Sequence, residues 1–396
     1  MSEWKKLKLS ECCSSIADGD HQPPPKAEAG IPFVTISNMP STNQFDFSDT
    51  LFVPQDYYDK LDEKRKARKD DILYSVVGSF GIPVFMKEDK AFVFQRHIAI
   101  LRPDNEKIVP RFLFYTMLTK DFYAKADAAA IGAAQRTVSL TALRNMEICI
   151  PDKIQQSKIV DTLAAYDDLI ENNQKQIKLL EETAQRLYKE WFVDLRFPRY
   201  EDIEIVDGVP EGWTVKSMED IADYLNGYAF KPSDWGEVGK PIIKIKELND
   251  GITKDTPRNT GDDIPEKYRV FPGDIVFSWS ATLTAKIWDA EEGLLNQHLF
   301  KVTPYDGFCR EYVLQSILKT LDEFRNLTTG STMKHIQRGK LKQVFVKVPS
   351  PKIMDEYKKY ADTIRQQILV LSHKIIILQE ARDRLLPKLM SGEIGL

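Results

Sequence analysis

Two stretches of the chain repeat mostly apolar residues in a heptad pattern. The residues recur in alternating steps of four and three from 159 to 191, a period of about 3.5 that is typical of helices paired in a coiled coil. The pattern returns from 357 to 389. We therefore predict two long helices with a coiled-coil seam at Ile159, Leu163, Tyr166, Ile170, Asn173, Ile177, Leu180, Leu187, Ile364, Ile368, Leu371, Ile375, Leu378 and Leu385.

Three local features bear on these helices. Asn173 is the polar member of the first seam, and such a residue fixes the register of paired helices at some cost in stability. Pro387 lacks a backbone amide proton, so we predict that it ends or kinks the second helix near Leu386. Residues 191–198 are rich in aromatic side chains, and we expect them to leave the first helix as an aromatic plug.

The rest of the chain also repeats itself. Trp4 is matched by Trp213, and Gln95-Arg96-His97 is matched by Asn296-Gln297-His298. The offset between the copies falls from 209 to 198 residues along the chain, as small loop deletions in the second copy would produce. Each copy is therefore a globular part followed by a long helix.

The globular parts are predicted to mix strands with a helix. Short alternating segments broken by Pro, Gly and Asp are typical of half-buried strands. In the first copy these segments are Pro32–Ser37, Ile72–Val77, Phe92–Leu101 and Met146–Ile150. One helix is expected near Arg111–Lys125, and its equivalent near Arg310–Phe324.

The predicted fold class is α+β, with two tandem mixed α/β domains and an internal pseudo-two-fold repeat. We place the first domain at 1–150, the first helix and a linker at 151–208, the second domain at 209–348 and the second helix at 349–396. The helices are expected to form an antiparallel coiled coil that separates the domains. A parallel pair would need the linker to return about 50 Å along the first helix.

Composition and charge narrow the class of protein. With 42% hydrophobic and 29% charged residues and a net charge of −4, the chain has the composition of an ordinary globular protein. Its longest aliphatic run is far shorter than the roughly 18 residues of a membrane span, so we expect a cytoplasmic protein without membrane contact. The four cysteines form no Cys-x-x-Cys pair, so no metal site is predicted.

A pseudo-two-fold rod about 50 Å long suits a DNA duplex read as two half-sites. At 3.4 Å per base pair that length corresponds to roughly 15 base pairs. Residues 325–354 contain basic but no acidic residues, which favours local docking of a polyanion. The natural target is two base patches with an unread gap.

These features together resemble a known family. The tandem domains, the heptad helices, Trp191–Asp194 and the closing segment Leu385–Ile394 closely resemble the DNA specificity (S) subunit of type I restriction-modification systems. The resemblance implies two target recognition domains, central and C-terminal conserved helical regions that act as a ruler, and a bipartite target with a fixed gap. It further implies double-stranded DNA, two methyltransferase (modification) subunits and restriction (motor nuclease) subunits as partners. S-adenosylmethionine, ATP and Mg²⁺ are then expected in those partners, with no cofactor in this chain.

Sequence readout requires polar and basic side chains on loops, because these meet base edges and phosphates. The copies differ most at such positions and agree at apolar ones. The candidate DNA-binding residues are Gln22, Lys26, Ser37, Asn38, Gln135, Arg136, Thr137, Lys231, Lys246, Ser278, Ser280, Lys334, His335, Gln337, Arg338 and Lys340. His97 and His298 occupy matching places, either as structural histidines or as DNA contacts.

No catalytic residue is predicted. Gln22-Pro23-Pro24-Pro25 lacks the aromatic residue of an adenine methyltransferase motif, and no phosphate-binding loop of the correct spacing occurs. Asp71 with Glu88–Lys90 could form a metal-dependent nuclease site, but a solvated turn explains these residues better. The alternatives are a stand-alone DNA nuclease or methyltransferase with an unrecognised motif, and a structural spacer protein.

Overall fold

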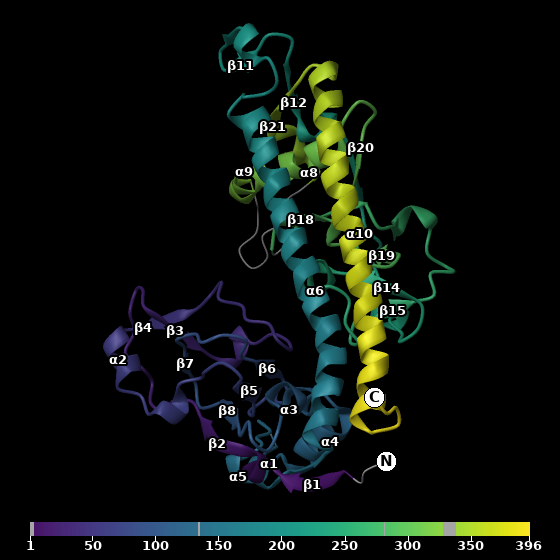
Figure 1. The fold of residues 1–396 in the computed structure, drawn as a ribbon. Coiled ribbons are helices and arrows are strands. Elements are labelled where there is room, and N and C mark those ends of the chain that lie inside the picture. Colours follow the sequence, from purple (N-terminus) through teal and green to yellow (C-terminus); the bar gives the residue numbers. More distant parts are fainter. Residues whose placement is uncertain (1–3, 134, 281, 328–337) are drawn as a thin grey trace. The chain divides into compact units, whose positions relative to one another are not determined.

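The computed structural model describes residues 4–133, 135–280, 282–327 and 338–396. The chain forms two compact units: the first unit contains residues 1–168 and 379–396, and the second unit contains residues 169–378. Figure 1 shows both units as a ribbon, with many of the elements labelled. Within the described residues no helix is sufficiently long and apolar to cross a membrane.

The first unit is built on an antiparallel four-stranded sheet. Its strand order is β2 (Cys13–Asp18), β8 (Ile98–Pro103), β5 (Ile72–Ser75) and β6 (Pro83–Phe85). A second sheet has the order β4 (Leu51–Val53), β3 (Ile31–Val34) and β7 (Val93–Phe94), with β3 and β7 parallel. A third pair joins the ends of the globular part, β1 (Lys5–Lys8) with β9 (Glu147–Ile150).

The second unit repeats this topology. Its main sheet has the order β13 (Ala222–Asn226), β20 (Leu299–Pro304), β17 (Ile275–Ser278) and β18 (Thr284–Ile287). Its smaller sheet has the order β15 (Arg258–Asn259), β14 (Lys240–Ile243), β19 (Gly293–Leu295) and β16 (Arg269–Val270). The closing pair is β12 (Thr214–Ser217) with β21 (Phe345–Val348), preceded by the hairpin β10 (Ile205–Val206) and β11 (Val209–Pro210). The internal repeat is therefore structural.

Short helices cover the sheets and differ in part from the prediction. The first unit has α1 (Leu9–Cys12), α2 (Gln55–Asp59), α3 (Pro110–Met117), α4 (Lys120–Ala129) and α5 (Leu140–Asn145), and the second has α7 (Ile245–Asp250), α8 (Arg310–Lys319) and α9 (Leu321–Asn326). The single helix predicted over 111–125 is wrong, because Thr119 leaves the helical conformation and its hydroxyl caps α4 at Phe122 N. Thr320 separates α8 from α9, but it makes no side-chain cap, and its hydroxyl instead donates to Ser316 O at 2.8 Å. Both interruptions are threonines, which favour helix ends over helix interiors.

The strand predicted over Phe92–Leu101 is also two strands. β7 ends at Phe94, and β8 begins at Ile98 in a different sheet. The intervening turn is held by Gln95 N donating to Val34 O at 2.9 Å and by Ile98 N donating to Gln95 O at 3.0 Å. The polar triplet Gln95-Arg96-His97 interrupts the apolar residues at this turn, a signal that the prediction of a single strand did not use.

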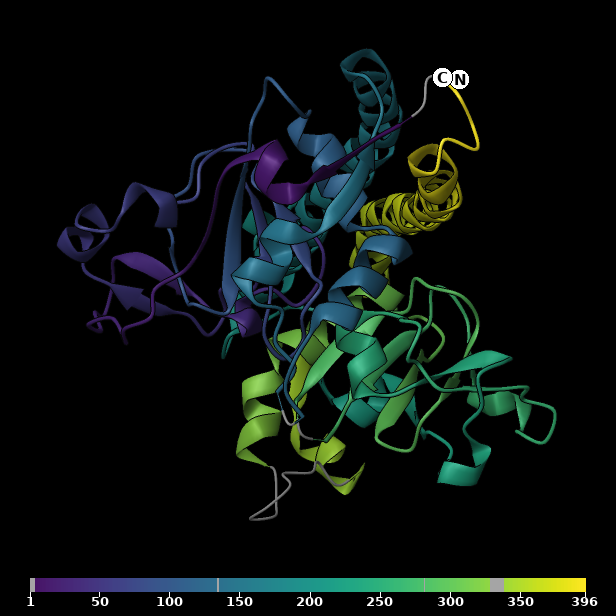
Figure 2. The same cartoon turned by 90° about the horizontal axis from the view of Figure 1, so that it is seen from below.

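The two heptad segments form α6 (Lys153–Tyr188) and α10 (Pro351–Met390). In the first unit the start of α6 packs on the end of α10, since Ile159, Leu163, Leu386 and Leu389 share one core; both views show these ends as neighbours (Figures 1 and 2). In the second unit the rings of Trp191 and Tyr357 lie 5.7 Å apart, at opposite ends of the two helices. The helices are therefore antiparallel, as predicted.

The predicted seam lies on the buried side of these helices. Each of its residues is buried or half-buried, including Asn173. Of the two predicted effects of Pro387, an end or a kink of the helix, the end is wrong, because α10 continues to Met390. A proline in the last helical turn removes only one backbone hydrogen bond, and Ser391 N still donates to Pro387 O at 3.0 Å.

The expected aromatic segment after α6 is buried in the second unit. The last turn, η3 (Lys189–Val193), is a π-helix that carries Trp191 and Phe192 into the core. The Phe192 ring lies 5.0 Å from that of Tyr312 and 4.8 Å from that of Tyr357, both edge to face. Aromatic pairs in this geometry contribute about 0.5–1.5 kcal/mol each beyond their burial, so this cluster anchors α6 to α8 and α10.

An ion pair joins each globular part to its own long helix, and its polarity is reversed between the copies. In the first unit Arg111 on α3 lies 2.9 Å from Asp168 and 3.9 Å from Asp167 on α6. In the second unit Glu311 on α8 binds Arg365 on α10 through Nη2 at 2.7 Å and Nε at 3.0 Å. Arg111 and Glu311 are each the second residue of their helix, and the sequence offset places Asp167 opposite Arg365 in the repeat.

Removal of Arg365 should destabilise the second unit. Glu311 is only 1% exposed, so Arg365→Ala would leave a buried carboxylate with Gln315 as its remaining partner at 2.8 Å. We expect the free energy of unfolding to fall by about 3–5 kcal/mol, measured by chemical denaturation. Arg186→Ala is the matched control, because that side chain is 81% exposed and lies 3.7 Å from Glu182; it should cost under about 1 kcal/mol. Equal losses for the two variants would contradict this assignment.

Candidate functional site

In both units the chain passes from the smaller sheet to the larger one through a tight turn. Gln95–His97 joins β7 to β8, and Asn296–His298 joins β19 to β20. A parallel bridge between Asp20 and Gln95 in the first unit has its counterpart between Tyr228 and Asn296 in the second. The two turns are therefore equivalent in structure as well as in sequence.

A glycine makes each turn possible by letting two backbone segments touch. A Cβ atom on Gly19 would lie 2.1 Å from Phe94 O, and one on Gly227 would lie 2.2 Å from Asn296 O. Neither position can therefore carry a side chain. The residue before each glycine ends a strand of the main sheet, with Asp18 opposite Ala99 and Asn226 opposite Phe300. This close contact between two backbone segments, which we call the glycine crossing, thus brings residue 18 or 226 to the turn.

A pocket of about 270 Å³ opens beside the turn of the first unit. It gathers the end of β2, the turn itself and the segment that precedes α5. The lining residues are Asp18, Val76, Val77, Arg96, His97, Gln135, Thr137, Val138, Ser139 and Leu140. Apolar side chains form its floor, and polar groups with complementary hydrogen-bonding abilities surround it, as is usual for a binding site.

The polar side chains of the pocket include both hydrogen-bond donors and hydrogen-bond acceptors. Asp18 Oδ2 lies 2.7 Å from His21 Nε2. Burial, with a smaller contribution from the Arg96 charge, lowers the pKa of His97, which favours the neutral imidazole. Arg96 is exposed and has no ion-pair partner within the described part of the chain. The pocket therefore offers a carboxylate, a guanidinium and an amide to a ligand.

The second unit keeps the histidine and changes its neighbours. His298 corresponds to His97, whereas Asn226 replaces Asp18 and Gln297 replaces Arg96. Gln297 is exposed, with Nε2 3.5 Å from His298 Nε2, and the Trp279 ring lies 6.0 Å from the His298 ring. Two charged residues in the first copy are thus replaced by two amide residues in the second, on one backbone scaffold.

The predicted DNA-binding residues of the first unit fall into different environments. Gln22 and Lys26 are exposed on a loop, and Ser37 is exposed in a short 3-10 helix, η1 (Ile36–Asn38). Asn38 is 4% exposed and its amide is used internally, with Oδ1 accepting from Thr35 N at 2.9 Å and Nδ2 donating to Asp46 O at 2.9 Å. Asn38 therefore holds a loop together.

The segment 135–137 passes beside the pocket, and two of its three residues line it. Gln135 and Thr137 line it. Arg136 points elsewhere, because its guanidinium binds the Asp127 carboxylate and lies over the Phe80 ring at 5.5 Å. Of these three candidates, Gln135 and Thr137 are the ones the fold places in the pocket.

The candidates of the second unit are more dispersed. Lys231 and Lys246 are exposed, whereas Ser278 and Ser280 are 0% and 1% exposed, and Ser278 Oγ donates to Ser280 O at 3.1 Å. Arg338 lies 3.2 Å from Asp223, and Lys340 lies 3.3 Å from Gln343. Lys334, His335 and Gln337 lie outside the described residues.

Sequence reasoning missed Asp18 and Arg96. The signal was present in the repeat, because the matched triplets Gln95-Arg96-His97 and Asn296-Gln297-His298 differ at their middle residue while the histidine is kept. Asp18 could be found only after the Gly19 and Gly227 crossings were aligned, since β2 is remote from the turn in sequence. A histidine that is kept in both copies, with neighbours that differ between the copies, is the sequence signal that marks the site.

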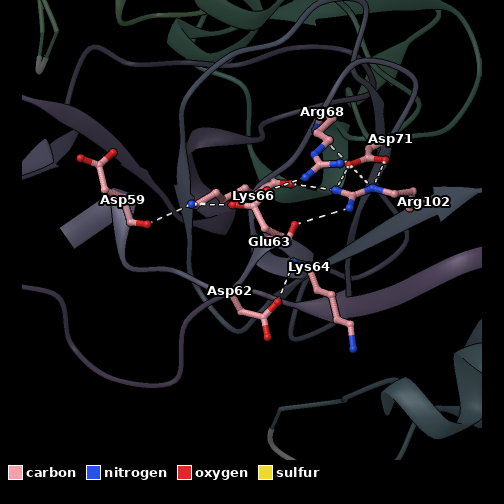
Figure 3. Close-up of polar contacts among 8 residues, drawn as sticks. All are labelled: Asp59, Asp62, Glu63, Lys64, Lys66, Arg68, Asp71 and Arg102. Carbon is pink, nitrogen blue, oxygen red and sulfur yellow. Dashed lines mark hydrogen bonds and ion pairs between the residues drawn. The ribbon is translucent and has the colours of Figure 1, made fainter. Parts of the chain in front are cut away.

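Asp71, considered as a metal ligand, is a structural carboxylate instead. It is 2% exposed and binds Arg102, with Nη2 2.9 Å and Nε 3.1 Å from its oxygens (Figure 3). Arg68 N donates to it at 2.9 Å, and the neighbouring Glu63 binds Lys66 and Arg68. Among the residues that the structure describes, no group of three His, Cys, Asp or Glu side chains could hold a metal ion.

Comparison with known proteins places this architecture in a family. The model of the type I restriction modification DNA specificity domain matches residues 1–182 and 210–376. The type I restriction enzyme HindI specificity subunit of Haemophilus influenzae is 23% identical over all of both chains. The MjaIX specificity subunit of Methanocaldococcus jannaschii is 24% identical over 72% of this chain and 69% of its own.

A solved structure shows the same fold. The type I restriction-modification S subunit from M. genitalium superposes with a TM-score of 0.57 at 16% identity, covering 98% of this chain and 96% of that one. The chain therefore belongs to the family of type I restriction-modification DNA specificity subunits, whose members recognise DNA sequence and are not themselves enzymes.

Proposed function

We propose that this chain reads a bipartite DNA sequence, one half-site with each unit, across a gap set by the paired helices. The observation that supports the proposal is the structural repeat: equivalent sheets and turns carry different polar residues. Two readers with one scaffold and different side chains would recognise two different half-sites.

The paired helices support a fixed gap. α6 has 36 residues and α10 has 40, which corresponds to about 54 and 60 Å at 1.5 Å per residue. Both helices take part in the core of each unit. A change in the length of the pair should therefore change the number of base pairs between the half-sites.

The proposed partners are double-stranded DNA, two methyltransferase subunits and restriction subunits. S-adenosylmethionine would be bound by the methyltransferase, and ATP and Mg²⁺ by the motor nuclease subunits. This chain would contribute sequence recognition and a surface that holds those subunits on DNA. The family membership supports a role within such complexes.

The proposal predicts one two-part methylation motif. Long-read mapping of methylated adenines in a host that carries this chain and its methyltransferase should show two specified half-sites with a constant gap. A host with the methyltransferase alone should show no such motif. A continuous motif, or modification that persists without this chain, would contradict the proposal.

Binding should also depend steeply on salt. We expect the complex of this chain with its methyltransferase to bind a duplex carrying the motif with log K falling linearly as log salt rises, because phosphate contacts release counterions. Fluorescence anisotropy between 50 and 300 mM salt measures the slope. A structural spacer that contacts only proteins would show negligible affinity and a flat response.

The ruler is tested by lengthening both helices together. Seven residues inserted after Asn173 and seven after Leu371 add two helical turns, about 10 Å, so the gap should grow by about three base pairs while both half-sites persist. As a control, seven residues inserted after Gly208, in the exposed turn between β10 and β11, should leave the gap as it was. Methylation mapping reports both, and an unaltered gap after the helical insertions would refute the ruler.

A further inference from the structure

We propose that Arg96 and Gln297 are equivalent specificity-determining residues, Arg96 reading a guanine in one half-site and Gln297 an adenine in the other. The inference rests on the proposed function, and it assigns base classes to two residues at matching turns. It follows from the placement of these two side chains, from the exposure of both, and from the hydrogen-bonding patterns of the two bases.

The backbone under both residues is fixed before any ligand binds. Arg96 N donates to Asp20 O at 2.9 Å, and Gln297 N donates to Tyr228 O at 2.9 Å. The glycine crossings leave no room for movement toward the neighbouring segment. A side chain on such a turn loses little conformational freedom of the backbone on binding, which favours specific readout.

Arg96 differs from several other arginines of the first unit because its guanidinium forms no ion pair with a described residue. Arg65 lies 3.3 Å from Asp20, Arg102 lies 2.9 Å from Asp71, and Arg136 binds Asp127. Arg96 is exposed at the pocket and forms no ion pair with any residue the structure describes. Its guanidinium is therefore available to a ligand.

The chemistry of the two side chains distinguishes the bases. A guanidinium donates two parallel hydrogen bonds to O6 and N7 of guanine in the major groove, whereas a glutamine amide donates to N7 and accepts from N6 of adenine. The neighbouring residue changes together with residue 96 or 297. In the first unit Asp18 lines the same pocket as the Arg96 cation. In the second unit the neutral Asn226 takes the place of Asp18, and Gln297 carries no charge. Each pair is thus electrostatically balanced.

The test exchanges the two readers. In Arg96→Gln, the first half-site should lose its guanine preference at one position, with affinity for the wild-type sequence lowered about 5- to 150-fold, and the second half-site and the gap should persist. Gln297→Arg should alter one adenine position of the other half-site. Binding of the methyltransferase complex to duplexes with each base pair of the mapped motif replaced in turn measures both effects.

Two controls separate base reading from charge. Arg96→Lys keeps the cation but not the planar fork, so it should lose the guanine preference as well. Lys64→Gln removes one charge from an exposed side chain that points away from its neighbours (Figure 3), and should leave every base preference intact. Equal thermal midpoints show that the variants are folded.

The inference would be overturned if Arg96→Gln retained the guanine preference, or if affinity fell uniformly across all duplexes, as loss of a phosphate contact would produce. Failure of the proposed function is a separate result, because the wild-type chain would then show no two-part motif at all.

Discussion

Each unit is completed by the helix of the other repeat. The core of the first unit contains Leu386 and Leu389 from the end of α10, and the core of the second contains Trp191 and Phe192 from the end of α6. Residues of both long helices therefore complete each core, and this exchange of helix ends is the constraint on which the fold depends. The antiparallel pairing follows from it, since opposite ends must meet in both units.

The reversed ion pairs favour the pairing of each globular part with its own long helix over pairing with the other one. The two helices have similar apolar seams, so apolar packing by itself distinguishes poorly between them. Arg111 faces Asp167 and Asp168, whereas Glu311 faces Arg365. Placing either globular part on the other helix would set like charges against each other, with Arg111 opposite Arg365. Repulsion of that kind suppresses wrong pairings more strongly than it changes affinity for the right one.

The sequence predicted what depends on periodicity and missed what depends on local chemistry. The seam residues and the repeat follow from long regular patterns, in which many residues agree, and the antiparallel pairing follows from the length of linker that a parallel pair would need. The break at Thr119 and the turn at Gln95–His97 each depend on a few hydrogen bonds, which apolar spacing does not encode. Among the candidate site residues, Asn38, Ser278 and Ser280 have the right chemistry for readout but are buried, and burial depends on contacts between segments distant in sequence.

Where the backbone segments cross at Gly19 and Gly227, the groups that hold the turn differ from the side chains that would contact a ligand. Backbone hydrogen bonds and the absence of a Cβ atom hold the turn, and neither involves the side chains of residues 18 and 96 or of residues 226 and 297. These side chains can therefore change without altering the sheets beneath them, as the two copies within this one chain demonstrate. Residues such as Asp71 and Arg102, which hold the same domain together, are paired and largely buried. A recognition module built in this way can acquire a new half-site at little cost in folding free energy, because exposed substitutions away from structural contacts typically change stability by no more than about 0.5 kcal/mol.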